Sequence, residues 1–326
     1  MTVGKAIGFG IAVFAAAFFL TSPACAQDWP NKPVKVIVPF GAGGTTDRQG
    51  RIVADHLSKV FKQQFYIENR VGGGGTLGSA QVARTEPDGY TLMIGGYGQH
   101  VMGPAVNPSI GYDPIGDFTH IAMIGGESFV LAAHSALGIK TFKDLIALSK
   151  SRAEPINCGT PGAGSLGELM VAQFQRKAIF NVNHIPYRGG APLLTDFFGN
   201  HVSVAALPAS AIVQHVAVGT VAPLAVTSSE RMPAFKDTPT FAELGYPDIS
   251  GAIWVWVAGP KNLPAPVVAK LNEEVRRFMR SPEMKQDFER QAMSLMDADV
   301  VELNKFIVAE LKRWTAFVQE AGIKPQ

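Results

Sequence analysis

The chain has 326 residues, and its 29 Lys and Arg against 27 Asp and Glu give a formal net charge of +2. This balance argues against nucleic acid or an anionic surface as a partner. The length is sufficient for two domains of ordinary size.

Residues 1–26 have the pattern of a cleavable export signal. Lys5 precedes an apolar run that is too short for a comfortable membrane span, and Ala24 and Ala26 occupy the small positions of a cleavage site. We expect cleavage after Ala26 and a soluble, monomeric protein in the periplasm. Cys158 is the single cysteine of that mature chain, so no internal disulfide is expected.

The strongest local pattern follows this signal. Val34–Val38 is a β-branched run typical of a buried strand, and the next residues hold three glycines and two threonines before an apolar helical spacing begins. The pattern predicts a strand, a glycine turn and a helix capped by Thr45 or Thr46. Backbone N–H groups at such a helix start suit a carboxylate or phosphate, while a tight turn without a ligand is the alternative interpretation.

Strands and helices alternate along the rest of the chain. Strands are predicted at 64–68, 90–94, 120–124, 129–133, 156–158, 182–185, 202–206, 224–226 and 253–258, and helices at 77–84, 141–151, 166–175, 191–198, 209–218, 264–280, 282–291 and 300–320. Pro104, Pro108 and Pro114 predict an irregular segment between two of these strands. The alternation predicts an α/β fold with parallel sheets that helices cover on both faces.

Three glycine loops follow predicted strands, at Phe40–Asp47, Gly95–His100 and Gly159–Ser165. Ligands of α/β sheets bind beyond the carboxyl ends of the strands, so a cleft between two α/β lobes is the simplest prediction. The loops contain no Lys or Arg. A bound anion would therefore be held by backbone N–H groups, hydroxyls and helix N-termini.

Short motifs extend over the whole chain, among them Trp29-Pro30-Asn31-Lys32-Pro33, Ile37-Val38-Pro39-Phe40, Glu68-Asn69-Arg70, Pro87-Asp88-Gly89-Tyr90-Thr91-Leu92 and Leu224-Ala225-Val226-Thr227. This series resembles the extracytoplasmic solute receptors of tripartite tricarboxylate transporters, the family of TctC and the Bug receptors. The resemblance implies a type II-like, Venus-flytrap binding protein that closes on a small organic carboxylate. Its partners would be the integral-membrane transporter subunits, and no cofactor or metal is expected.

The resemblance also implies how the chain is divided. Lobe 1 would comprise residues 27–125 and lobe 2 residues 126–250, and residues 251–326 would return to lobe 1. The chain then crosses between the lobes at least twice, which makes a hinge.

The resemblance further implies a set of ligand-binding residues. These are Phe40, Gly43, Thr45 and Asp47 in the first loop, Tyr97, Gly98, Gln99 and His100 in the second, Thr160 and Ser165 in the third, and position 207, here Leu207. Tyr187 is a further candidate from the sequence itself. Asp47 could instead complement a helix N-terminus, Tyr187 could instead pack in the core, and His100 could instead be a solvated loop histidine. Two positions depart from the family pattern. Glu168 stands where many members have histidine, and Leu207 stands where many have Asp or Asn, which argues against an amino-acid solute.

Two other classes of function were weighed. Ser165 with His184 and Asp196 could form a hydrolase triad, but the sequence around Ser165 lacks the first glycine of a nucleophile elbow, so we expect no enzyme. A carboxylate-sensing receptor that docks to a signalling protein would use the same cleft. The sequence leaves the solute open among tricarboxylates, dicarboxylates, aromatic acids and nicotinate-like acids.

Overall fold

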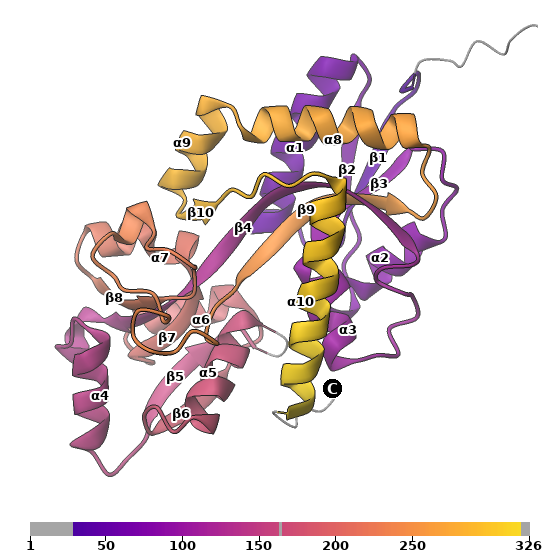
Figure 1. Ribbon diagram of the computed structural model, residues 1–326. Coiled ribbons are helices and arrows are strands. Elements are labelled where there is room, and N and C mark those ends of the chain that lie inside the picture. Colours follow the sequence, from indigo (N-terminus) through magenta and orange to yellow (C-terminus); the bar gives the residue numbers. More distant parts are fainter. Residues whose placement is uncertain (1–28, 163–164, 321–326) are drawn as a thin grey trace, which may run out of the picture.

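The computed structural model describes residues 29–162 and 165–320, which form two lobes joined by long strands (Figure 1). The predicted signal peptide at 1–26 lies outside the described residues. No helix in the described part of the chain is long and apolar enough to cross a membrane. The predicted two-lobed α/β architecture is confirmed.

The first lobe has a sheet with helices on both faces. Its strands are β1 (Val34–Val38), β2 (Phe65–Asn69), β3 (Thr91–Gly96), β9 (Ala252–Pro260) and the short β10 (Met293–Ser294), and its helices are α1 (Thr45–Phe61), α2 (Thr76–Ala83), α3 (Gly103–Val106), α8 (Ala265–Met279), α9 (Pro282–Arg290) and α10 (Val300–Glu320). Apolar residues of α1 and α8 pack on one face of the sheet, and residues of α10 pack with Tyr97 and Trp256 on the other.

The second lobe repeats the arrangement on a smaller sheet. Its strands are β5 (Ile156–Thr160), β6 (Val182–Pro186), β7 (Val204–Pro208) and β8 (Val221–Val226), and its helices are α4 (Phe142–Lys150), α5 (Leu166–Arg176), α6 (Gly190–Phe198) and α7 (Ala209–Ala217). Short 3₁₀ turns lie at Ser135–Leu137 and Pro233–Phe235 in this lobe, and at Gly73–Gly75 in the first lobe. Helices α4 and α5 cover one face of this sheet, and α6 and α7 cover the other.

β4 (Phe118–His134) is one continuous strand that belongs to both sheets. Its first part, Phe118–Ser128, pairs antiparallel with β9, and the part from Phe129 onward pairs antiparallel with β7 and β8. The sequence predicted two shorter strands here, with a break at Gly125–Ser128, and that prediction is wrong. The two glycines serve close packing, because a Cβ at Gly125 or Gly126 would collide with an aromatic ring.

The pairing along β4 bears on the predicted division of the chain. The partner of β4 changes from β9 to β7 between Ser128 and Phe129, and the chain returns to the first sheet at Ala252. The boundaries at 125 and 250 remain a prediction, which these two crossings support.

The sheets are mixed, which corrects the prediction that they are parallel. β1, β2 and β3 run parallel, as do β5, β6 and β7, but β9 is antiparallel to both β3 and β4. A helical crossover fixes a parallel orientation only between the strands that it joins. β4 and β9 are connected through the second lobe, not by a single helical crossover. β4 leads from the first lobe to the second and β9 leads back, so the two strands are antiparallel.

Local signals locate most helix ends. The capping box predicted from Thr141 and Asp144 is confirmed at the start of α4. Helix α1, by contrast, begins after Gly44, which makes no side-chain cap. Neither Thr45 nor Thr46 is therefore the N-cap, and both lie in the first turn.

The segment after β3 begins as a helix and is irregular only over residues 107–117, so the irregular chain predicted from Pro104, Pro108 and Pro114 is confirmed in part. A π-helical turn at Gly98–Met102 runs directly into α3, and Pro104 lies in the first turn of that helix. Proline cannot donate a hydrogen bond to the preceding turn, and the Gln99 carbonyl accepts from the Tyr112 hydroxyl at 2.8 Å instead. π-helical turns are rare and often lie at functional sites.

We predict that Gly125→Ala destabilises the protein by roughly 1–3 kcal/mol, the usual cost of overpacking a core. The added Cβ would collide with the ring of Phe288 beneath β4. Urea unfolding measures the change. Gly190→Ala is the matched control, since no heavy atom lies within 4 Å of a Cβ at that position. Equal midpoints for the two variants would contradict the packing of β4.

Candidate functional site

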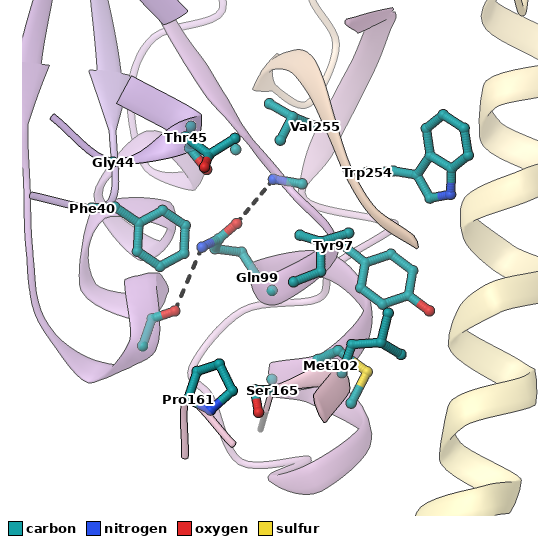
Figure 2. Close-up of a pocket in the computed structure, with 18 of the residues that line it drawn as sticks. Phe40, Gly44, Thr45, Tyr97, Gln99, Met102, Pro161, Ser165, Trp254 and Val255 are labelled. Atoms are coloured by element: carbon teal, nitrogen blue, oxygen red, sulfur yellow. Dashed lines mark hydrogen bonds between the residues drawn. The ribbon is translucent and has the colours of Figure 1, made fainter. Parts of the chain in front are cut away.

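A cavity of about 890 Å³ lies between the two lobes, and Figure 2 shows part of its lining. Both lobes and the strands that join them contribute to its wall. The lining residues are Phe40, Gly41, Gly44, Thr45, Thr46, Gly73, Gly74, Thr76, Gly95, Gly96, Tyr97, Gly98, Gln99, Met102, Gly103, Val106, Asn107, Ser109 and Ile110 from the first lobe, Pro161, Ser165, Leu166, Glu168, Gly190 and Pro208 from the second, and Glu127, Phe129, Ile253, Trp254 and Val255 from β4 and β9.

Several helices begin at this wall. Thr45 and Thr46 form the first turn of α1, Ser165 is the N-cap of α5, and Gly190 is the first residue of α6. Neither α1 nor α6 has a side-chain cap. The described lining contains no Lys or Arg. Positive potential at the wall therefore comes from helix N-termini, each equivalent to roughly half an elementary charge.

Gln99 ties two glycine loops together at the floor of the cavity. Its side-chain oxygen accepts a hydrogen bond from the Gly96 N–H at 2.9 Å, and its amide nitrogen lies 3.5 Å from the Gly74 carbonyl oxygen (Figure 2). The side chain is fully buried. Gln99 thus fixes the shape of the wall through its own amide.

Tyr97 connects the cavity to α10. Its ring lines the wall, and its hydroxyl donates to Glu310 Oε2 at 2.7 Å. The same oxygen accepts from Arg313 Nη2 at 2.7 Å and from Trp314 Nε1 at 3.2 Å. Burial, followed by the charge of Glu310, raises the pKa of Tyr97 well above its usual value, so the hydroxyl stays protonated as a donor.

Half of the predicted ligand-binding residues line this cavity. These are Phe40, Thr45, Tyr97, Gly98, Gln99 and Ser165. The other half, Gly43, Asp47, His100, Thr160, Tyr187 and Leu207, lie outside the wall.

Asp47 supports the first loop from behind. Its carboxylate accepts from the Gly43 N–H at 2.9 Å, from Arg51 Nε at 2.9 Å and from Asn69 Nδ2 at 2.8 Å. The side chain is only 2% exposed. Despite the cost of burial, these bonds hold the pKa of Asp47 below its usual value. The alternative interpretation, in which Asp47 complements the N-terminus of α1, therefore fits the geometry.

His100 is buried below the cavity floor, which corrects its predicted place among the lining residues. Its ring centroid lies 4.5 Å from that of Phe118, 4.9 Å from that of His120 and 5.6 Å from that of Trp256. Neither ring nitrogen has a hydrogen-bond partner among the described residues. Burial, and then the neighbouring His120, lower the pKa of His100 well below its usual value.

The remaining three predicted contacts are also engaged elsewhere. Thr160 is buried, with its hydroxyl 2.7 Å from His184 Nε2, and the Tyr187 hydroxyl donates to Asp196 Oδ2 at 2.8 Å. Leu207 is fully buried in the core beneath α6 and α7. Thr160 and Leu207 lie on strands, whose alternate residues point to opposite faces, and the sequence does not reveal which face is which. Tyr187 follows the end of β6.

The triad considered from the sequence is not assembled. His184 contacts Thr160, Asp196 contacts Tyr187, and the Ser165 hydroxyl accepts from the Glu168 N–H at 3.1 Å as a helix cap. A serine nucleophile needs a base within hydrogen-bond reach. Among the described residues, no group of His, Cys, Asp and Glu is placed to hold a metal ion.

Sequence reasoning missed part of the wall. Gly73 and Gly74 belong to a further glycine loop for which no ligand contact was predicted, and Trp254 lies on a strand read only as apolar. Glu127 is the most consequential omission. It was read as part of a loop between strands, whereas it lies on β4 at the centre of the molecule. The sequence signal that could have identified Glu127 is its position as a charged residue between two apolar runs.

Glu127 is a buried carboxylate on the cavity wall, only 5% exposed. It accepts from the Ser210 hydroxyl and from the Ser210 N–H at 3.3 Å, and the Thr45 hydroxyl bonds to it from the other lobe. Burial raises its pKa, against the opposing effects of Ser210, Thr45 and the charge of Arg48.

Comparisons with known proteins point to one family. A family model described as the tripartite tricarboxylate transporter family receptor, TctC, matches residues 50–323. Protein BugT of Bordetella pertussis is 31% identical over 315 residues, which cover 96% of this chain and 97% of that protein.

Two solved structures share the fold over nearly the whole chain. Rpa4515 of R. palustris, solved with adipate, has a TM-score of 0.82 and 32% identity, and the match covers 92% of this chain and 100% of that one. MatC of Rhodopseudomonas palustris, solved with bound malate, has a TM-score of 0.75 and 29% identity, with coverage of 89% and 99%.

The buried histidines predict that stability falls as the pH drops from about 6.5 toward 4. Burial lowers the pKa of His120 to about 4, and that of His100 is also lowered. In this window the unfolded chain takes up protons that the folded chain does not, so acid favours unfolding. For His120 alone, a pKa of about 4 in place of 6.5 lowers the free energy of unfolding by about 3 kcal/mol once the pH is below both values.

The measurement is urea unfolding at several pH values. His100→Leu should make this pH dependence shallower, because an unpaired buried imidazole is replaced by an apolar side chain of similar size. His201→Leu, at an exposed position, is the control and should leave the slope unchanged. A slope that is the same in both variants would contradict the burial of His100.

Proposed function

The chain belongs to the tripartite tricarboxylate transporter receptor family, whose model matches residues 50–323, and on this premise we propose that it is a periplasmic receptor for a small organic carboxylate. The solute binds in the cavity between the lobes, the lobes close on it, and the receptor delivers it to transporter subunits in the membrane. We propose that Phe40, Thr45, Tyr97, Gly98, Gln99 and Ser165 contact it.

The observation that carries the proposal is a cavity between lobes that helix N-termini face and that no described Lys or Arg lines. Hydrogen bonds to a charged acceptor contribute about 1.5–3 kcal/mol each. A few such bonds are enough for micromolar binding, which corresponds to about 8 kcal/mol. The adipate and malate in the similar structures are small carboxylates, which supports the same class of solute here.

A carboxylate sensor that docks to a signalling protein would use the same cavity, and nothing in its geometry favours that alternative. The least favoured alternative, a serine hydrolase, lacks support because Ser165, His184 and Asp196 have separate partners.

A thermal-shift screen of the mature protein against organic acids tests the proposal. An acid present at 100 times its dissociation constant should stabilise the fold by about 2.7 kcal/mol, since it binds only the folded state. Nucleosides and neutral sugars serve as controls and should produce no shift. If no organic acid raises the melting temperature, the proposed function is wrong.

The first loop should bind through its backbone shape. Gly43 has a φ of +85° and open space around an added Cβ, so valine there is strained by its backbone and not by crowding. We predict that Gly43→Val weakens binding of the best acid from the screen by more than about tenfold, measured by calorimetry. Gly138→Val is the matched control, because Gly138 has equal space and a similar φ of +75° but lies in a loop that does not line the cavity, and it should cost less than about threefold.

Arg48→Ala tests the opposite mechanism in the same assay. Arg48 is exposed and does not line the cavity, so its loss should cost less than about tenfold. A severe effect of Arg48→Ala together with a mild effect of Gly43→Val would show that a side-chain ion pair holds the solute.

A further inference from the structure

We propose that Glu127 selects carboxylate solutes that also carry a protonated amine, so that the receptor prefers aminocarboxylates to simple dicarboxylates. This inference rests on the proposed function and specifies the solute class of the same cavity. It assigns the carboxylate of the solute to the helix N-termini and its ammonium group to Glu127.

The first observation is the position of Glu127. It lies on β4 where that strand passes from one sheet to the other, and it bonds to the start of a helix in each lobe, Thr45 of α1 and Ser210 of α7. The side chain is 5% exposed, and what remains open faces the cavity. These partners hold the carboxylate in a fixed position before any solute arrives.

The second observation is the charge of the wall. Glu127 and Glu168 are the acidic residues among the described lining residues, and that lining contains no Lys or Arg. The charge of Arg48 acts on Glu127, but Arg48 is exposed and lies outside the wall. The lining side chains therefore give the wall a net negative charge, which the helix N-termini and, from outside the wall, Arg48 oppose.

This combination has a consequence for binding. A carboxylate can be held at the start of α6 in the second lobe, because this helix has no side-chain cap and hydrogen-bond donors at a helix N-terminus suit anions. The start of α5 is less suited, since Ser165 caps it and Glu168 lies in its first turn. A second carboxylate placed near Glu127 would meet a like charge in a poorly solvated site, which is unfavourable. An ammonium at the same point would instead complete the hydrogen bonding of Glu127 with a charge-assisted bond.

The proposal replaces an argument made from the sequence. The leucine at position 207 argued against an amino-acid solute because no acidic group would stand there to bind an ammonium. Leu207 is buried in the core behind the wall, so it has no bearing on the solute. The acidic group is supplied from β4 by Glu127 instead.

Matched probes of equal length test the proposal. Calorimetry or thermal shift would compare 4-aminobutyrate, succinate and butyrate, and then 6-aminohexanoate, adipate and hexanoate, on the mature wild-type protein. We expect the aminocarboxylate to bind at least about tenfold tighter than the diacid in at least one series. This ranking on the unaltered chain decides the question without any variant.

Glu127→Gln then tests the residue itself. It keeps the shape of the side chain and removes the charge, so it should weaken the aminocarboxylate, strengthen the diacid and reduce their ratio by at least about tenfold. Glu274→Gln is the matched control. Glu274 is another buried carboxylate, 7% exposed and paired with His56 and Arg277, but it lies on α8 away from the cavity. It should change stability and leave the ratio unaltered.

The outcomes of these binding measurements distinguish failure of this inference from failure of the proposed function. Diacids that bind as tightly as the aminocarboxylates overturn the inference and leave the carboxylate receptor intact. An unchanged ratio in Glu127→Gln also overturns it, because another group would then select the amine. If none of these six acids binds but another acid of the thermal-shift screen does, the inference fails and the proposed function stands. If no acid of that screen binds, the proposed function fails and the inference fails with it.

Discussion

The passage of β4 through both sheets is the constraint on which the rest of the structure depends. A single strand can pair with β9 on one stretch and with β7 and β8 on the next only if its backbone stays extended across the junction. Gly125 and Gly126 allow this, because rings pack directly on the backbone there. The carboxyl ends of β1, β3 and β5 then face one space, and the helices that follow these strands begin at its wall.

The glycine loops around this space present backbone N–H groups, and buried side chains hold that backbone in position. Asp47 holds the Gly43 N–H, and Gln99 holds the Gly96 N–H. Both side chains are buried and well bonded, so the loops need little rearrangement to accept a ligand. A cation on a long side chain would be more strongly hydrated and less ordered before binding.

Helix α10 links the cavity wall to both lobes. Glu310 accepts from Tyr97 on the wall, and Arg313, which pairs with Glu310, donates to the Ser250 carbonyl at 3.1 Å in the segment that leads back from the second lobe. Near the end of the helix, Glu320 pairs with Arg176 of α5 at 2.8 Å. An exposed pair of this kind adds little stability, whereas the buried Tyr97 contact is protected from solvent.

The sequence by itself determined the features that depend on short-range patterns. The apolar residues at helical spacing in 300–320 are Leu303, Ile307, Leu311, Trp314 and Val318, and all of them except the half-buried Leu311 lie in the core. Glycine after a β-branched run marked the loop that lines the cavity, because strand, turn and helix each impose requirements on neighbouring residues. The family resemblance identified the two-lobed architecture in the same way, from motifs distributed along the chain.

Only the tertiary structure decided which side chains reach the cavity. His100 and Gln99 are adjacent in the sequence, yet Gln99 lies on the wall and His100 is buried beneath it. Glu127 resembled a residue of a polar turn until the pairing of β4 placed it between the lobes. Whether a residue faces a ligand depends on the strand register and on the elements that cover each face, and contacts between residues far apart in the sequence set both.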